Sequence, residues 1–333
     1  MEDVRRDRRY LAELEEVAAA VTGRAGAMLL ERYGAPISVE FKDEKRTDPV
    51  TEADRAVEAF VRSELLGHFP AHGFLGEEGT LEGADAEYLW VLDPLDGTAN
   101  FAGRLPFFGV SLALLRNGVT VVGCLFVPFG PRLRAGVLRC SYGNGASIDG
   151  DRLRLPRTPF RPTGPVALPP AHRWAFQMRG ELAKRPGELR NLGSICYELA
   201  MVVGGGFQYA AFVRPRIWDV AAGALLVREA GGAALTWDGR SWRSLERFVA
   251  PPLSRRGKPT TLRDWGQAVL VGAPCPMQRL ARELRVRPAP PLALRWAFRR
   301  QRDVQGWWRR RTAGSQPKAD RVSSGTSTAS GPP

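Results

Sequence analysis

Two stretches of the chain repeat their apolar residues with the period of an amphipathic helix. The first runs from about Arg5 to Arg32, and its apolar positions can share one face of a helix. They are Leu11, Leu14, Val17, Ala18, Val21, Met28 and Leu29. The second stretch carries Ala53, Val57, Phe60, Val61 and Leu65. Thr51 fits the N-cap of this second helix, and Asp54 follows three residues later, as in a capping box.

The pattern then changes to short apolar runs broken by turn residues. The segment "FLGEEG" at 74–79 indicates a strand that runs into a loop, and Tyr88–Leu92 a short buried strand that ends just before two aspartates. Residues 107–128 have the signature of a hairpin with Asn117 and Gly118 at its turn. A meander of further strands is expected up to about residue 154.

A proline-rich segment from Leu155 to Pro170 predicts a connection between two lobes. Beyond it the pattern predicts helices near Ser194–Val203, over Asp219–Glu229 and in "MQRLARELR", with strands near Gln208–Val213, from Ala233 and in "AVLVGAP". We therefore expect an N-terminal α+β lobe over residues 1–155 and a C-terminal α/β lobe over 156–286. A tail over 287–333 has a basic, Pro- and Ser-rich composition typical of disorder.

The composition is that of a soluble globular protein. The chain has 333 residues, of which 44% are hydrophobic and 25% charged. No run approaches about 18 uninterrupted apolar residues, and the N-terminus lacks an apolar signal core, which argues against membrane insertion and secretion. The four cysteines, Cys124, Cys140, Cys196 and Cys275, form no CxxC pair. They predict reduced, mostly buried thiols in a cytoplasmic protein.

The positive charge is concentrated in the tail. The net charge is +13, and ten Arg or Lys against two Asp between Arg287 and Pro333 place +8 of it in the last 47 residues. The remainder of the chain carries only 13 − 8, or +5. The globular part therefore shows no general signature of a nucleic-acid-binding protein.

Four groups of acidic residues are candidates for chemistry. They are Asp48 with Asp54, Glu77 with Glu78, Asp93 with Asp96, and Asp219. Each has an ordinary structural interpretation: Asp54 completes a capping box, Asp219 favours a helix N-terminus, and Glu77 belongs to a solvated turn. The alternative is a shared functional site on loops that rigid elements hold in place.

The segment Asp93-Pro94-Leu95-Asp96-Gly97-Thr98 favours the functional interpretation. Pro94 restricts the backbone and Gly97 permits a tight turn, so both carboxylates and the Leu95 carbonyl can face one place. Two carboxylates so close together repel each other unless a cation lies between them. Ligands that are all oxygen suit a hard cation, Mg²⁺ above Zn²⁺.

Four blocks of sequence resemble the inositol monophosphatase family of Mg²⁺-dependent, lithium-sensitive phosphatases. They are "DPVTEAD" at 48–54, "GEEG" at 76–79, "DPLDGTANF" at 93–101 and "WDVAAGALLVREAGG" at 218–232. They occur in the order and spacing of that family, and the similarity extends from about residue 5 to 286. The resemblance implies an α+β fold, a layered αβαβα sandwich, with two or three Mg²⁺ ions between the two lobes.

The resemblance also implies roles for particular residues. Glu77, Asp93 and the Leu95 carbonyl would hold one metal, and Asp93, Asp96 and Asp219 a second. The catalytic residues would be Glu77, Thr98 and Asp54, with Thr98 and Asp54 together orienting the attacking water. The amides of Gly97 and Thr98 would bind the substrate phosphate, beside Glu77, Leu95, Asp96 and Asp219. Gly193, Ser194 and Ile195 would line the organic part of the substrate.

These roles imply a phosphatase that hydrolyses a small phosphate monoester by direct attack of a water that the metal activates. The substrate classes of the family include inositol phosphates, histidinol phosphate, nucleotide 3′-phosphates and sugar phosphates. In relatives that act on inositol phosphate, a glutamate lies seven residues before the last aspartate ligand. Here that position is Phe212, with Arg214 and Arg216 close by. The two arginines are either surface charges or selectors of a substrate with a second anionic group.

The tail allows a second interpretation of the protein. Its segment "RWAFRRQRDVQGWWRRR" is either a solvated extension or a basic element for nucleic acid or an anionic membrane. In the second case the chain is a regulatory or binding protein built on the phosphatase scaffold. The expected partners are a small phosphorylated metabolite and, since the family often forms dimers, a second copy of the chain.

Overall fold

The computed structural model of the protein describes residues 8–33, 39–41, 49–130, 134–170, 172–252 and 260–288. The chain separates into one compact unit, Met1–Arg287, and a second, Pro288–Pro333. All the elements below belong to the first unit. Asp48 and all of the tail beyond Pro288 lie outside the described residues, and so does the side chain of Thr51.

An eight-stranded mixed sheet forms the N-terminal half, in the order β10-β9-β8-β7-β6-β5-β3-β4. Its strands are β3 (Gly73–Gly76), β4 (Leu81–Glu82), β5 (Tyr88–Asp96), β6 (Gly109–Arg116), β7 (Val119–Val127), β8 (Gly136–Ser141), β9 (Gly145–Ile148) and β10 (Asp151–Leu153). The predicted hairpin is confirmed as β6 and β7, whose turn residues Asn117 and Gly118 both have positive φ. A further pair, β1 (Val39–Phe41) and β2 (Pro49–Thr51), lies before this sheet in the chain.

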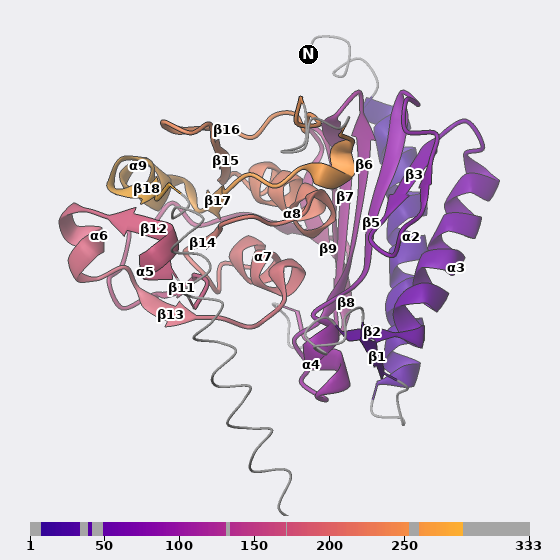
Figure 1. Cartoon of the computed structure of the whole chain (residues 1–333), viewed down its shortest axis with the longest axis horizontal. Coiled ribbons are helices and arrows are strands. Elements are labelled where there is room, and N and C mark those ends of the chain that lie inside the picture. The colour runs from indigo at the N-terminus through magenta and orange to yellow at the C-terminus, as the bar shows by residue number, and fades with distance from the viewer. Residues whose placement is uncertain are drawn as a thin grey trace, which may run out of the picture. The chain divides into compact units, whose positions relative to one another are not determined.

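The two amphipathic helices cover one face of this sheet. They are α2 (Arg8–Arg32) and α3 (Glu52–His68) (Figure 1). Their apolar stripes meet Trp90, Phe108 and other inward-facing side chains of the sheet in one buried cluster. Gly26 of α2 lies directly against the Phe126 ring, so closely that a Cβ at this position would overlap the ring.

A six-stranded sheet forms the C-terminal half, in the order β13-β11-β14-β17-β15-β16. Its strands are β11 (Pro165–Ala167), β13 (Glu188–Arg190), β14 (Tyr209–Phe212), β15 (Ala233–Trp237), β16 (Trp242–Ser244) and β17 (Val269–Gly272). Helices α7 (Ile195–Val203) and α8 (Ile217–Glu229) lie between the two sheets, and α6 (Gly180–Lys184) and α9 (Pro274–Glu283) lie on the outer side of the second (Figure 1). The layers are those of the αβαβα sandwich expected from the sequence.

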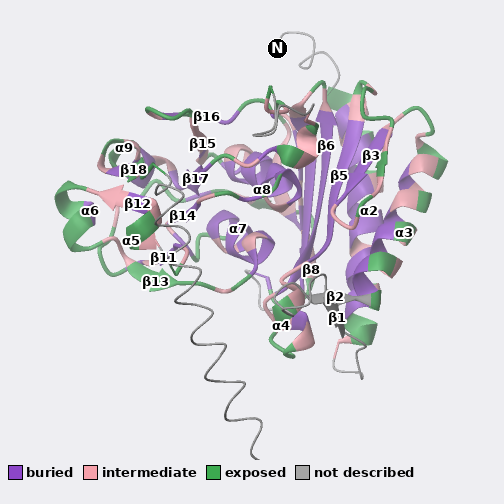
Figure 2. Cartoon of the chain, viewed as in Figure 1, coloured by how far each residue is buried: buried purple, intermediate pink, exposed green. Residues whose placement is uncertain are grey.

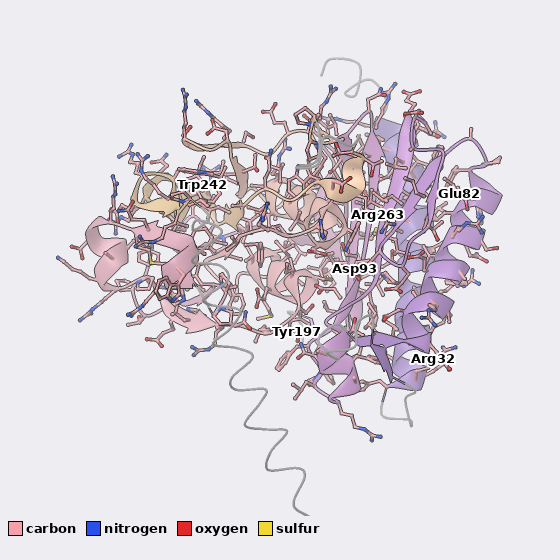
Figure 3. The ribbon with its side chains drawn as sticks, viewed as in Figure 1. Arg32, Glu82, Asp93, Tyr197, Trp242 and Arg263 are labelled. Atoms are coloured by element: carbon pink, nitrogen blue, oxygen red, sulfur yellow. The ribbon has the colours of Figure 1, made fainter. Side chains whose placement is uncertain are left out.

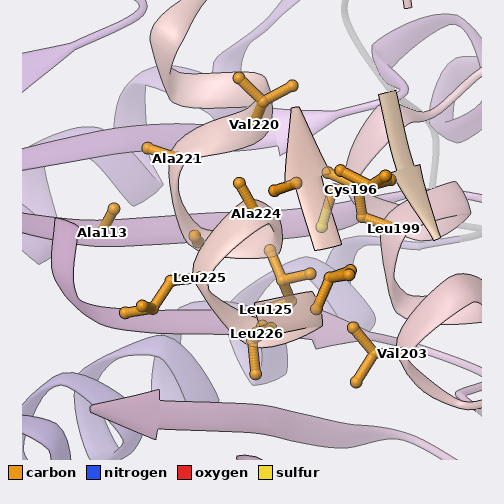
Figure 4. Close-up of a cluster of buried hydrophobic side chains, with 14 of the residues drawn as sticks. Ala113, Leu125, Cys196, Leu199, Val203, Val220, Ala221, Ala224, Leu225 and Leu226 are labelled. Carbon is orange, nitrogen blue, oxygen red and sulfur yellow. The ribbon is translucent and has the colours of Figure 1, made fainter. Parts of the chain in front are cut away.

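The central helices are buried on nearly all sides. Figure 4 shows Leu199 and Val203 of α7, Val220 and Leu226 of α8 and Leu125 of β7 in one buried cluster. Buried residues fill these inner layers, while exposed residues lie on the outer helices (Figure 2). Burial of this apolar surface is the main force that holds the two sheets to the central helices.

Three boundaries differ from those predicted. Strand β5 does not end at Leu92 but continues to Asp96, so both aspartates lie within it. Helix α8 begins at Ile217, which makes Asp219 its third residue. The last predicted helix ends at Glu283, where a short strand, β18 (Leu284–Val286), follows and pairs with β12 (Phe176–Met178). Helix α5 (His172–Ala175) precedes β12.

The connection between β16 and β17 leaves the six-stranded sheet and crosses to the eight-stranded one (Figure 1). We call its described residues, 245–252 and 260–268, the strap. The amide of Phe248 donates to the carbonyl of Gly118 at the β6–β7 turn, at 2.8 Å. Phe248 packs edge-on against Trp265 with ring centroids 4.8 Å apart, and Trp265 is only 2% exposed. A single turn of 3₁₀ helix, η1 (Leu262–Asp264), lies just before Trp265.

Two expectations from composition concern the cysteines and the helices. All four cysteines are among them and are free thiols, three buried and Cys275 exposed. Within the described part of the chain, none of the helices is both long and apolar enough to cross a membrane.

Candidate active site

The end of β5 carries two of the candidate ligands. Asp93 pairs with Ser111 of β6, and the pairing becomes irregular between Asp93 and Asp96. Gly97 then adopts a left-handed conformation with φ of 89°, which costs a glycine little, and a short helix, α4 (Thr98–Ala102), begins at Thr98. The irregular pairing and the turn together place acidic side chains at the point where the strand leaves the sheet.

Asp93 is the most deeply buried of these acids, at 2% exposure. Burial raises its pKa well above the usual range, and the charges of Glu77, Asp96 and Asp219 raise it further. A hydrogen bond between the Asp93 and Glu77 side chains acts in the same direction. Two carboxyl groups this close together repel each other when both are ionised, unless a proton or a cation lies between them.

Asp96 is held by the start of α7. Its Oδ2 accepts from the Ser194 hydroxyl at 3.0 Å and from the backbone amide of Cys196. The pKa of Asp96 is raised to about 6. Burial is the cause, and it outweighs the hydrogen bonds from these groups and from the amides of Gly97 and Ile195, which lower the pKa. Ser194 is also the N-cap of α7, since its Oγ accepts from the Tyr197 amide at 3.1 Å.

Asp219 reaches the same place from α8. Its Oδ2 accepts from the Arg216 amide at 2.7 Å, which fixes the side chain at the first turn of the helix. Burial, then the charge of Asp96, raises its pKa well above the usual range. Trp218, the residue before Asp219, is hydrogen-bonded to β6: the Ser111 hydroxyl donates to the Trp218 carbonyl at 2.7 Å. Since Ser111 is the partner of Asp93 in the sheet, this bond brings Asp219 to the end of β5.

Glu77 lies in the turn after β3, which we call the Glu77 loop (residues 76–80). The Glu77 amide donates to the Leu92 carbonyl at 3.1 Å, so the loop lies beside β5. Two charged side chains from distant parts of the chain also hold it. The Glu58 carboxylate accepts from the Glu78 amide at 2.9 Å, and the Arg263 guanidinium donates to the Glu77 carbonyl at 3.0 Å.

Sequence reasoning missed both of these residues. Glu58 follows Asp54 by one turn on the polar side of α3, and both are buried, at 4% and 3% exposure. That helical spacing was the available signal. Arg263 lies in the strap, 186 residues from Glu77, and no local pattern marks it.

Thr98 and the Leu95 carbonyl lie together, since the Thr98 hydroxyl donates to that carbonyl at 3.0 Å. Asp54 lies in the first turn of α3 and is buried. The predicted pairing of Thr98 with Asp54 stays a prediction.

The candidate substrate-lining residues begin at Gly193, whose φ is 75°. The Asn100 side-chain amide donates to the Phe107 and Leu192 carbonyls, each at 2.7 Å, so α4 is fastened to this segment. Leu192 in turn donates its amide to the Glu198 carboxylate at 2.7 Å. The segment is thus anchored on both sides of Gly193.

Phe212, the candidate specificity residue, is 6% exposed and belongs to the apolar cluster between the sheets. It lies in β14 opposite Val269. Arg214 and Arg216 are exposed.

The donor set fits a hard divalent cation by its chemistry: four carboxylates and one carbonyl, with no nitrogen or sulfur among them. Burial is the main cause of the raised pKa of Asp93 and of Asp219, and the charges of the neighbouring acids raise both pKa values further. As they stand, no three of the described His, Cys, Asp and Glu side chains surround one point as a complete metal site would. One carboxylate oxygen of Asp96 and one of Asp219 accept hydrogen bonds from backbone amides, which leaves the other oxygen of each available as a metal ligand.

Comparison with known proteins identifies the scaffold. A model of the inositol monophosphatase family matches residues 10–270. The chain belongs to the inositol monophosphatase family. It is 36% identical over 224 residues to the inositol-1-monophosphatase of Mesorhizobium japonicum, covering 65% of this chain and 82% of that protein. It is 34% identical over 230 residues to the Nus factor SuhB of Escherichia coli (strain K12), covering 67% of this chain and 85% of that protein.

Solved structures of the inositol monophosphatase family have the same fold. The extragenic suppressor protein SuhB of Bartonella henselae matches with a TM-score of 0.63 at 27% identity, over 81% of this chain and 97% of that one. The inositol monophosphatase of Anabaena matches with a TM-score of 0.61 at 28% identity, over 82% and 95%. The family supports a metal-dependent phosphatase on this scaffold.

Proposed function

We propose that the protein is a Mg²⁺-dependent phosphatase that hydrolyses a small phosphate monoester. The observation that carries the proposal is the gathering of four acids, Glu77, Asp93, Asp96 and Asp219, from three distant segments at one buried end of β5. Such a concentration of negative charge away from water is costly unless a cation neutralises it.

In this proposal, two or three Mg²⁺ ions bind to these four carboxylates and to the Leu95 carbonyl. Bound Mg²⁺ would neutralise phosphoryl oxygens, lower the pKa of a water molecule and stabilise the leaving oxygen. The amides of Gly97 and Thr98 hold the phosphate at the start of α4. Glu77, Thr98 and Asp54 orient the attacking water, and Gly193, Ser194 and Ile195 contact the organic part.

We propose that the preferred substrate carries a second anionic group or a nucleotide. Phe212 offers no acceptor for a hydroxyl and packs into the apolar cluster between the sheets, so a polyol in the site would lack the partner that a glutamate supplies at this position, at about 1–3 kcal/mol for each hydroxyl left unpaired. Arg214 and Arg216 supply positive charge on the following residues, and guanidinium groups pair well with phosphate. This supports a phosphorylated substrate other than myo-inositol 1-phosphate.

The test is phosphate release from a panel of compounds with Mg²⁺ and with chelator. The panel contains myo-inositol 1-phosphate, histidinol phosphate, adenosine 3′,5′-bisphosphate and fructose bisphosphate. We expect Mg²⁺-dependent hydrolysis, with a higher kcat/KM for at least one doubly anionic or nucleotide compound than for inositol phosphate. Absence of hydrolysis with every compound would overturn the phosphatase, and preference for inositol phosphate would overturn the role of Phe212.

A regulatory role is the second candidate, because one similar relative is named as a Nus factor. In that case the basic tail would contact nucleic acid or a partner complex. Variants in which the acidic metal ligands are replaced would then keep the regulatory role. A cytoplasmic location, a homodimer and the division into lobes at residues 155 and 156 remain parts of the proposal. The four free thiols support a reducing compartment.

A further inference from the structure

Charged side chains hold the Glu77 loop from two opposite directions. From α3, the Glu58 carboxylate accepts from the Glu78 amide at 2.9 Å and from the Thr80 amide and hydroxyl at 3.4 and 2.6 Å. From the strap, the Arg263 guanidinium donates to the carbonyls of Glu77 at 3.0 Å, Thr80 at 3.4 Å and Gly76. The anion thus binds backbone donors of the loop and the cation binds its acceptors.

The loop is shaped to admit these contacts. A Cβ at Gly76 would overlap the Glu58 carboxylate, so only glycine allows the carboxylate to approach so closely. The Gly76 amide donates to the Thr80 carbonyl at 2.9 Å, which closes the loop on itself. Glu77 therefore lies in a loop whose backbone amides bind Glu58 and whose carbonyls bind Arg263.

Arg263 also touches the other half of the site. Its guanidinium lies over the ring of Trp218, 5.3 Å from the centroid, and Trp218 directly precedes Asp219. One side chain therefore contacts the loop of Glu77 and the residue beside Asp219, which belong to opposite halves of the fold. Figure 3 shows Arg263 above Asp93 of β5 in this view.

A hydrogen-bonded turn of the strap carries Arg263. The Thr261 hydroxyl accepts from the Arg263 amide at 3.2 Å, and the Asp264 carboxylate accepts from the Thr261 amide at 3.0 Å, which closes a capping box around one turn. The side chains of Trp265 and Phe248, which also belong to the strap, are themselves buried at 2% and 4% exposure. The arginine is held by a folded support and does not hang from a solvated loop.

We propose that Arg263 is a positioning residue of the metal site, which together with Glu58 sets where Glu77 stands relative to Asp219. The inference deepens the proposed function and rests on its assignment of these two acids as metal ligands. Groups that orient metal ligands typically change metal affinity about 10- to 100-fold when they are removed. The guanidinium fork can donate to several carbonyls at once, which a lysine ammonium on a flexible stem does less well.

The experiment measures Mg²⁺ affinity directly, by isothermal titration calorimetry on the full-length chain, and thermal unfolding in chelator. The variants are Arg263→Met, Arg263→Lys and Glu58→Gln, with Arg247→Met as the control, because Arg247 is an exposed arginine of the same strap. We expect Arg263→Met to weaken Mg²⁺ binding at least about tenfold. Arg263→Lys should fall between it and the wild type, and the control should bind normally.

The kinetic readout separates positioning from a general loss of structure. Raising the Mg²⁺ concentration should restore the kcat of Arg263→Met to within a few-fold of the wild type, while the Mg²⁺ concentration at half-maximal rate stays raised. A lower unfolding temperature with unchanged Mg²⁺ affinity would overturn the proposal and show a merely structural arginine. Should Arg263→Met not fold, Arg263→Lys carries the test, and wild-type affinity in that variant would overturn it.

The proposed function can fail separately. A wild type that binds Mg²⁺ but releases phosphate from no compound overturns the phosphatase, while the calorimetric comparison still decides the role of Arg263. A wild type that binds no Mg²⁺ overturns both.

Discussion

Glu198 offers a sharp test of the electrostatics around the site. It lies in α7, is 4% exposed and accepts the Leu192 amide at 2.7 Å. Burial raises its pKa from 4.5 to about 7, the charge of Asp96 adds to this, and donation from the amides of Leu192 and Gly193 opposes it. Because the folded protein favours the protonated acid, its stability should fall as this group ionises.

The size of the effect follows from the two pKa values. Below pH 4.5, the acid is protonated in the folded and unfolded chains alike and costs nothing. As pH rises from there to about 7, the unfolded chain ionises first, so unfolding becomes easier. Each unit of pKa difference corresponds to about 1.4 kcal/mol, so between about pH 5 and pH 8 the loss of stability from this one group comes to roughly 2–3 kcal/mol.

Glu198→Gln removes the titration and keeps an oxygen that can accept the Leu192 amide. We expect the stability of the variant relative to the wild type to rise by roughly 2–3 kcal/mol from pH 5 to pH 8. The measurement is urea unfolding at both pH values, with chelator in every buffer so that metal binding adds no pH dependence. Glu181→Gln, which removes an exposed carboxylate of α6, is the control.

An equal difference between Glu198→Gln and the wild type at both pH values would refute the argument, since it would mean that Glu198 ionises alike in the folded and unfolded chains. A difference that shrinks with rising pH would show that the carboxylate is stabilised in the fold.

Three further predictions follow from the site and the core. Asp93→Asn should lower kcat/KM by roughly a thousandfold or more, since it removes charge from the residue that we propose as a ligand of two metals, while far-ultraviolet circular dichroism stays normal; near-normal turnover would exclude Asp93 as a ligand. Gly26→Ala should lower the free energy of unfolding by about 1–3 kcal/mol because its Cβ would overlap the Phe126 ring, whereas Gly23→Ala in the same helix, whose Cβ would lie 3.6 Å from its nearest neighbour, should be neutral or stabilising. Truncation after Pro288 should leave phosphate release and the unfolding temperature nearly unchanged, since it keeps the bond from the Arg287 amide to Ala175 at 2.8 Å; loss of folding would show that the tail supports the core.

Features with a local physical cause could be predicted from the sequence. The helical period predicted α2 and α3, and the turn preference of Asn117 and Gly118 predicted the β6–β7 hairpin. The boundary of β5 could not be predicted in this way, because a strand that continues through two aspartates contradicts the hydrophobic pattern and is sustained by pairing with β6.

The candidate site also has some features that the local sequence predicts and others that depend on long-range packing. The carboxylates of Asp93 and Asp96 in one short segment predicted a cation site. Only the resemblance to the family added Glu77 and Asp219 to that site. The contacts of Arg263 depend on a crossing between sheets that no short-range pattern encodes. Burial of Phe212 within the core likewise emerges only from the packing of β14.

The strap has a consequence for the order in which the site is completed during synthesis. The Glu77 loop leaves the ribosome early, but the arginine that binds its carbonyls follows 186 residues later. At about 5–20 residues per second, that delay is roughly 10 to 40 seconds. For most of this interval the nascent chain holds Glu77, Asp93 and Asp96 but lacks Asp219, which precedes Arg263 by only 44 residues. A chain interrupted before the strap would therefore contain the acidic residues but lack the Arg263 contacts to the Glu77 loop. The site can be completed only after the strap has been synthesised.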